Sequence, residues 1–147
     1  MNQNETKRHY EFMEKAKEYV KKQSEELGRP LTYCVTTFGC QMNARDSEKL
    51  TGILEEVGYV AAEDEKADFV IYNTCTGREN ANLRVYGRLG VLHGYKKKNK
   101  HMTIALCGCM MQEPEVVEKL KKSYKYVDII FGTHNIFKFA ELIARNF

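Results

Sequence analysis

Short apolar runs alternate with longer amphipathic segments along most of this sequence. The runs have the β-branched and apolar character of strands, and the segments between them space their apolar residues three and four apart, as helices do. The predicted strands are 31–37, 59–62, 69–73, 103–107 and 127–131, and the predicted helices are 45–57, 79–95, 114–124 and 136–145. Strands joined by helix-length connections pair in parallel. The alternation therefore predicts an α/β fold: a doubly wound, mostly parallel sheet of about five strands, flanked by helices and joined by right-handed crossovers.

A further amphipathic segment precedes this series. Between residues 4 and 27 apolar side chains recur at helical spacing, and Gly28 and Pro30 end the pattern. We therefore predict that residues 1–29 form an N-terminal helical extension and that residues 30–147 form one α/β domain, in keeping with the size of single domains. An exposed amphipathic helix of this kind also favours self-association of the chain.

Two of the predicted helices carry specific local signals. Asn43 stands just before helix 45–57, where its side chain can cap the first turn. Gly87, Gly90 and Gly94 fall inside helix 79–95, and each costs about 1 kcal/mol relative to alanine. These glycines favour a break in that helix.

Composition excludes several classes of protein. Of the 147 residues, 43% are hydrophobic and 29% are charged, which is ordinary for a globular domain and unlike a disordered or rod-like chain. The net charge of +3 is too small to indicate a nucleic-acid partner by itself. We find no signal sequence and no run of about 18 apolar residues, so we expect a cytoplasmic protein without a membrane partner. In that compartment the five cysteines stay reduced and can bind metal.

Three of the cysteines follow predicted strands. Cys40, Cys75 and Cys109 lie in the loops that lead from the first, third and fourth strands into the next helices. In a parallel sheet these loops share the carboxyl edge, where α/β proteins bind ligands. With the common strand order 2-1-3-4-5 the three strands are neighbours about 4.8 Å apart, which brings the thiols within about 10 Å. Because four ligands are usual, three thiolates suggest an iron–sulfur cluster with one open iron.

Other interpretations of the same residues remain open. Zinc could take the three cysteines together with His134, which follows the fifth strand, or the cysteines could pack as small hydrophobic residues without metal. Cys34 and Cys107 lie inside strands and are expected to pack in the core. Gly39 and Gly108 each precede a cysteine, where glycine lets the backbone approach a bulky inorganic centre or simply form a turn.

Three segments resemble the amino-terminal domain of the methylthiotransferases in order, spacing and flanking residues. They are Thr-Phe-Gly-Cys-Gln-Met-Asn at 37–43, Asn-Thr-Cys at 73–75 and Gly-Cys-Met-Met-Gln at 108–112. The Gly-Cys-Gln-Met-Asn form is most similar to the tRNA branch, which adds a methylthio group to C2 of N6-dimethylallyladenosine next to the anticodon. The resemblance implies that Cys40, Cys75 and Cys109 hold an auxiliary 4Fe-4S cluster whose free iron accepts the sulfur destined for the base.

The resemblance also implies that more chain is needed for activity. Family members continue into a radical domain that binds a second 4Fe-4S cluster and S-adenosylmethionine, and then into an RNA-binding β domain. We therefore expect an N-terminal fragment without catalytic residues of its own, inactive alone, with tRNA as the partner of the full-length enzyme. Gly77 replaces the family's usual valine and is expected to loosen the Cys75 loop. The alternative is a non-catalytic α/β binding module, either zinc-binding or metal-free.

Overall fold

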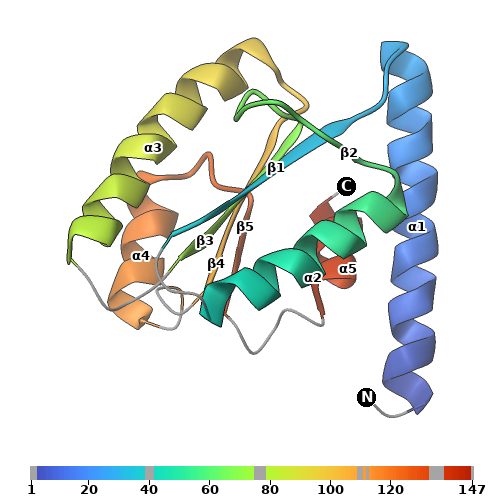
Figure 1. Cartoon of the computed structure of the whole chain (residues 1–147), viewed down its shortest axis with the longest axis horizontal. Coiled ribbons are helices and arrows are strands. Elements are labelled where there is room, and N and C mark those ends of the chain that lie inside the picture. Colours follow the sequence, from blue (N-terminus) through green and yellow to red (C-terminus); the bar gives the residue numbers. More distant parts are fainter. Residues whose placement is uncertain are drawn as a thin grey trace.

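The sheet is built from five parallel strands. The computed structural model describes residues 3–38, 42–74, 79–108, 111, 113–132 and 138–146. The strands are β1 (Thr32–Thr37), β2 (Val60–Ala61), β3 (Phe69–Thr74), β4 (Thr103–Gly108) and β5 (Ile129–Phe131). They pair in the order β2-β1-β3-β4-β5, and every neighbouring pair is parallel (Figure 1). The predicted α/β class and the 2-1-3-4-5 order are confirmed.

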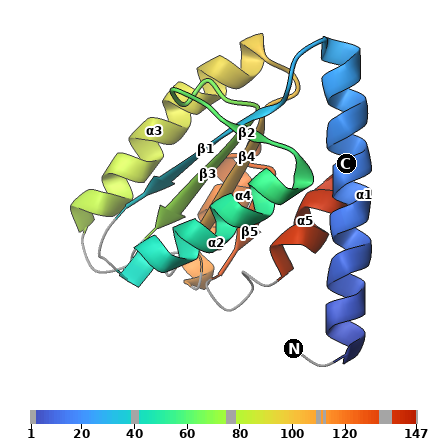
Figure 2. The ribbon, with the colours of Figure 1, turned by 45° about the vertical axis from the view of Figure 1, so that its right-hand side comes forward.

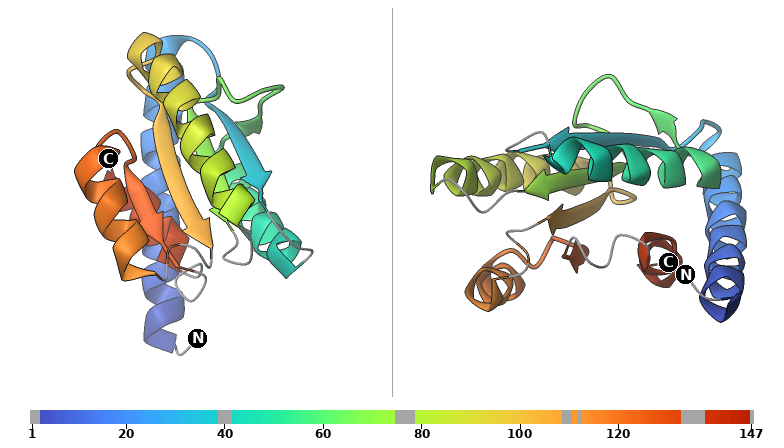
Figure 3. Two further views of the ribbon diagram at one scale, coloured as in Figure 1. Left: turned by 90° about the vertical axis from the view of Figure 1, so that its left-hand side faces the viewer. Right: turned by 60° about the horizontal axis from the view of Figure 1, so that its bottom comes forward.

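Helices cover both faces of this sheet. They are α1 (Gln3–Leu27), α2 (Met42–Val57), α3 (Glu79–Lys98), α4 (Pro114–Ser123) and α5 (Phe139–Asn146). Side chains alternate between the faces of a strand, so β3 and β4 supply two separate cores. One core joins the sheet to α2 and α5, and the other joins it to α3 and α4 (Figure 3). Every residue of β3 and β4 is buried, as the near-continuous apolar runs predict.

The N-terminal helix is part of the first core. Met13, Ala16 and Val20 are buried in the same cluster as residues of α2 and α5, and α1 runs beside α5 (Figure 2). Gly28 ends the helix with a φ of +70°, the left-handed conformation that favours glycine. The domain therefore covers the apolar stripe of the predicted N-terminal extension. Self-association of the chain stays a prediction.

The predicted cap of the second helix and the predicted break in the third helix are wrong. Helix α2 begins at Met42, so Asn43 lies inside its first turn and not ahead of it. Helix α3 runs without a break to Lys98. At Gly87, Gly90 and Gly94 an added Cβ would meet nothing within 4 Å, so these glycines lower the helix propensity without interrupting the helix and without serving a close contact.

A buried carboxylate joins the segments at the amino edge of the sheet. Asp68 is 2% exposed and accepts hydrogen bonds from Arg29 Nη1 and Nη2 (2.7 and 2.9 Å), from the Thr32 amide (2.9 Å) and from Asn99 Nδ2 (2.9 Å). Burial alone would raise the pKa of Asp68, but these hydrogen bonds and the Arg29 charge lower it to about 2. The ionised carboxylate therefore holds the end of α1, the starts of β1 and β3, and the end of α3 together.

None of the helices in the described part of the chain combines the length and the apolar character that crossing a bilayer requires.

Candidate functional site

The three strands that precede the candidate cysteines end side by side. Thr37 of β1 pairs with Asn73 of β3, and Thr74 of β3 pairs with Gly108 of β4. Thr74 and Gly108 are the residues directly before Cys75 and Cys109. Cys40, Cys75 and Cys109 lie outside the described residues, as do His134, Gly39 and Gly77. The structure thus confirms that the three strands before the candidate cysteines are neighbours. The set of metal ligands stays a prediction.

Hydrogen bonds tie these strand ends to helix α2. The Ser47 hydroxyl lies 2.6 Å from Thr37 Oγ1 and accepts a hydrogen bond from Asn73 Nδ2 at 3.1 Å. On the other side of β3, Thr74 Oγ1 donates to the Cys107 carbonyl at 2.7 Å. Asn73 and Thr74 are both fully buried, and buried polar groups are costly unless they are hydrogen-bonded. The ends of β1, β3 and β4 therefore form one fixed frame.

Gly108 brings the backbones of β3 and β4 unusually close together. Its φ is +102°, and a Cβ built on it would overlap the Thr74 carbonyl oxygen. Gly108 thus permits a close approach of the protein's own backbone at Thr74, and its approach to an inorganic centre stays a prediction. A side chain at position 108 would push the strand ends apart.

Apolar side chains close the base of this edge. Phe38, at the end of β1, and Met111, which follows Cys109 by two positions, are both buried in the core under α3 and α4. Phe38 packs edge-to-face on Tyr72 with ring centroids 5.0 Å apart. The exposed Arg84 guanidinium lies 5.8 Å from the Phe38 ring centroid. The core side of this edge is therefore apolar and buried, and at least one cation lies on its exposed side.

The two described cysteines are not suited to bind metal. Cys107 is fully buried and Cys34 is half-buried, and burial raises the pKa of both thiols. Metal binding requires the thiolate, which burial disfavours. Both residues pack in the core, as their positions inside strands predicted. Among the described residues no group of three His, Cys, Asp or Glu side chains could hold a metal ion.

The described frame nevertheless fits a thiolate-bound metal group. Strands β3 and β4 end in register, β1 ends one residue before them, and each of the three is followed within three residues by a cysteine. Cysteine thiolates are the usual ligands of iron–sulfur clusters and common ligands of zinc. The sequence motifs did not indicate that Ser47 and Asn73 hold these strand ends together. The one available signal was the pair of polar residues that ends the otherwise apolar run of β3.

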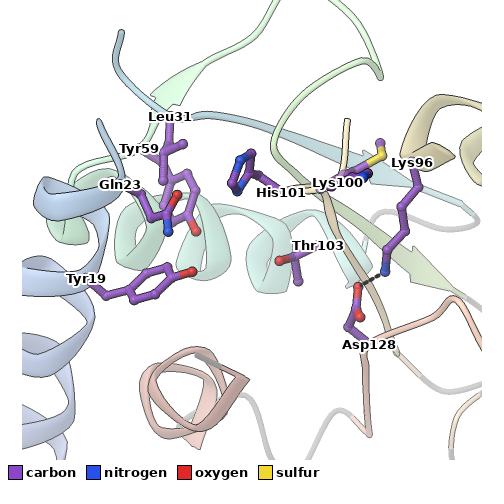
Figure 4. A pocket seen from close by; sticks show the side chains of 10 residues that line it. Tyr19, Gln23, Leu31, Tyr59, Lys96, Lys100, His101, Thr103 and Asp128 are labelled. Atoms are coloured by element: carbon purple, nitrogen blue, oxygen red, sulfur yellow. Dashed lines mark hydrogen bonds and ion pairs between the residues drawn. The ribbon is translucent and has the colours of Figure 1, made fainter. Parts of the chain in front are cut away.

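A second polar site lies at the opposite, amino edge. A pocket of about 240 Å³ is lined by residues that include Tyr19, Gln23, Lys100 and His101 (Figure 4). No motif in the sequence predicted a site there. The four-residue spacing of Tyr19 and Gln23, which places both on one side of α1, was the signal that could have indicated it.

Comparison with known proteins places these observations in a family. The profile described as "Uncharacterized protein family UPF0004" matches residues 32–132. A tRNA-2-methylthio-N(6)-dimethylallyladenosine synthase of Lachnoclostridium phytofermentans is 74% identical over 124 residues, which cover 84% of this chain and 27% of that protein. Proteins with the same name from Acetivibrio thermocellus and Clostridioides difficile are 51% and 53% identical over 140 and 134 residues, covering 95% and 88% of this chain but 29% and 28% of theirs. The chain thus spans under a third of these curated relatives. From the match over β1 to β5, this chain belongs to the UPF0004 family.

Proposed function

We propose that this chain is the auxiliary-cluster domain of a tRNA methylthiotransferase that modifies C2 of N6-dimethylallyladenosine next to the anticodon. The observation that carries the proposal is the 74% identity over 124 residues to a synthase named for that product. A tRNA substrate implies a cytoplasmic location. S-Adenosylmethionine and a second 4Fe-4S cluster would be bound by other parts of the longer protein.

Cys40, Cys75 and Cys109 would hold the auxiliary 4Fe-4S cluster. Support comes from the paired positions Thr74 and Gly108, which start two of the cysteine loops from adjacent points of the sheet. Three thiolates leave one of the four usual ligand positions open. When bound, the cluster supplies an iron site that can carry the sulfur destined for the base.

The described residues of this edge would position and shield the site. Ser47 and Asn73 fix the ends of β1 and β3, from which the Cys40 and Cys75 loops depart. Phe38 and Met111 exclude water from the base of the edge. Arg84 would offer a positive charge at the rim to an anionic cluster or to RNA phosphate.

Anaerobic reconstitution with iron and sulfide tests the cluster directly. We expect about four irons and four sulfides per chain, because a 4Fe-4S cluster has that composition. Replacement of Cys40, Cys75 or Cys109 by alanine should abolish uptake, whereas the matched variant Cys34→Ala should retain it. Gly77→Val should slow cluster loss. Failure to take up iron, together with zinc binding that depends on His134, would instead establish the zinc-binding module.

A chimera tests the activity of the whole protein. The homologous segment of the Lachnoclostridium phytofermentans relative would be exchanged for residues of this chain, and the tRNA nucleosides analysed by mass spectrometry. We expect the methylthio product from the chimera and none from its Cys75→Ala version. A folded chimera that carries its full iron content but forms no product would contradict the proposal.

A further inference from the structure

The pocket at the amino edge has an end that is rich in hydrogen-bonding groups. Tyr19 and Gln23 reach it from α1, and Tyr59 reaches it from the segment before β2, while His101 faces them across the space (Figure 4). The Gln23 Oε1 atom is buried and accepts no hydrogen bond from any described residue. A buried acceptor without a partner is unusual in a native structure. A small rotation of the Gln23 side chain would bring this enclosed oxygen to a ligand in the pocket, and a ligand that donates a hydrogen bond would satisfy it.

The other end of the pocket carries positive charge. Lys96 Nζ is already engaged by Asp128 Oδ2 at 2.6 Å and by the Tyr126 carbonyl at 2.9 Å. Asp128 Oδ2 also accepts the Ile104 amide at 2.9 Å, so its negative charge is satisfied within the fold. Lys100 is exposed, and its side chain makes no ion pair within the described ranges. An oxyanion beside Lys100 would therefore meet a cation that no carboxylate of the described chain neutralises.

These two ends differ in the chemistry that they recognise. The glutamine amide matches the donor and acceptor edge of adenine, and tyrosine and histidine rings stack on bases. The lysine end matches phosphate. A volume of about 240 Å³ is small for a ligand pocket, which suits a single nucleotide whose phosphate lies at the open rim.

We propose that this pocket binds adenosine monophosphate, either free or as one nucleotide of an RNA strand, with the adenine amine donating to Gln23 and the phosphate beside Lys100. The pocket is bordered by residues that precede β1, β2, β4 and β5, at the opposite edge of the sheet from the cysteine loops. The proposal therefore does not depend on the proposed cluster.

Isothermal titration calorimetry of the 147-residue chain tests the ligand. The probes are adenosine monophosphate, adenosine, inorganic phosphate and a short oligoadenylate. We expect adenosine monophosphate to bind at least tenfold more tightly than adenosine or phosphate, because only the nucleotide reaches both ends. Tighter binding of the oligoadenylate would assign the site to RNA, and tighter binding of the mononucleotide would assign it to a free nucleotide. The absence of binding by both at millimolar concentration would overturn the proposal.

Variants test the position of the site. Lys100→Ala and Gln23→Leu should each weaken nucleotide binding at least tenfold, whereas Lys125→Ala, at an exposed lysine outside the pocket, should not. Lys100 is exposed, so its variant keeps the test valid if Gln23→Leu fails to fold. Unchanged affinity in the Lys100 variant would contradict the proposed geometry. Iron uptake by the same preparations should be unaffected, which separates this result from the outcome for the cysteine edge.

Discussion

Gly108 and Thr74 stand opposite each other at the ends of β4 and β3, closer than any side chain at position 108 would allow. A Cβ at 108 would lie 2.6 Å from the Thr74 amide nitrogen and 2.8 Å from Asn73 Oδ1. The contact joins the two strand ends from which the Cys75 and Cys109 loops leave. The spacing between those loops is therefore set by a glycine.

Gly108→Ala should destabilise the protein strongly. The substitution combines a positive φ with overlap of the neighbouring backbone, so we expect the free energy of unfolding to fall by about 2 kcal/mol or more. Urea unfolding followed by circular dichroism measures this. A loss below about 0.5 kcal/mol would show that β4 can move away from β3 at little cost.

Gly94→Ala should have the opposite effect. Gly94 is exposed and lies within α3, away from both helix ends. Its φ is negative, and an added Cβ would meet nothing within 4 Å. Alanine lowers the backbone entropy of the unfolded chain and should stabilise the protein by about 1 kcal/mol. Gly94→Ala, unfolded in urea in the same way, is the matched control for Gly108→Ala. Destabilisation by this variant would mean that the helix needs glycine there.

Asp68 should make stability depend on acid pH. Its folded pKa of about 2 lies below the ordinary value of 3.8, so its ionised form stabilises the fold fully above about pH 5. That contribution, about 2 kcal/mol from the shift, should be lost as the pH falls from about 4 through 2. Urea unfolding at a series of pH values measures the slope.

Asp68→Asn separates this carboxylate from the other acids. The variant should be less stable than the wild type at pH 7 by about 2 kcal/mol, and the difference should shrink towards pH 2. Glu56→Gln, at an exposed position on α2, should leave the wild-type profile unchanged. A difference for Asp68→Asn that stays constant across the acid range would exclude the ionised carboxylate as its cause.

Cys107 should resist alkylation in the folded chain. Its side chain is fully buried and its pKa is raised by burial, so both access and thiolate content are low. Mass spectrometry after iodoacetamide treatment at pH 8 should show labelling at least ten times slower than in urea. Half-buried Cys34 should react at an intermediate rate. Equal rates for Cys107 with and without urea would contradict the described packing.

Most of the sheet could be predicted because its signals are local. The run Phe69–Thr74 is apolar over its first four residues, and β-type runs of that length between helix-length connections specify parallel strands. The predicted strand at 127–131 is shorter in the structure, where β5 begins at Ile129. The reason is tertiary, because the carboxylate of Asp128 is held by Lys96 and by the Ile104 amide.

Contacts between distant polar residues could not be predicted. Asp68 meets Arg29 and Asn99, which lie 39 and 31 positions away in the sequence, and no periodic pattern relates them. Ser47 and Asn73 are likewise 26 positions apart. The candidate cysteines could be predicted because each follows a strand, whereas the residues that hold those strand ends meet only after folding. The pocket at the amino edge depends on α1 packing on the domain, which the extension hypothesis did not include.

Helix α1 packs on α5, so the packing of α1 on the domain is complete only after α5 has folded. Arg8 and Glu141, whose side chains are 2.7 Å apart, are separated by 133 positions. During synthesis, which proceeds from the N-terminus, the apolar stripe of α1 is made long before α5 leaves the ribosome. Closing so long a loop is slow because its entropy is lost before the contact forms. A nascent chain stalled before residue 139 should therefore leave open to chaperones the part of this stripe that α5 covers.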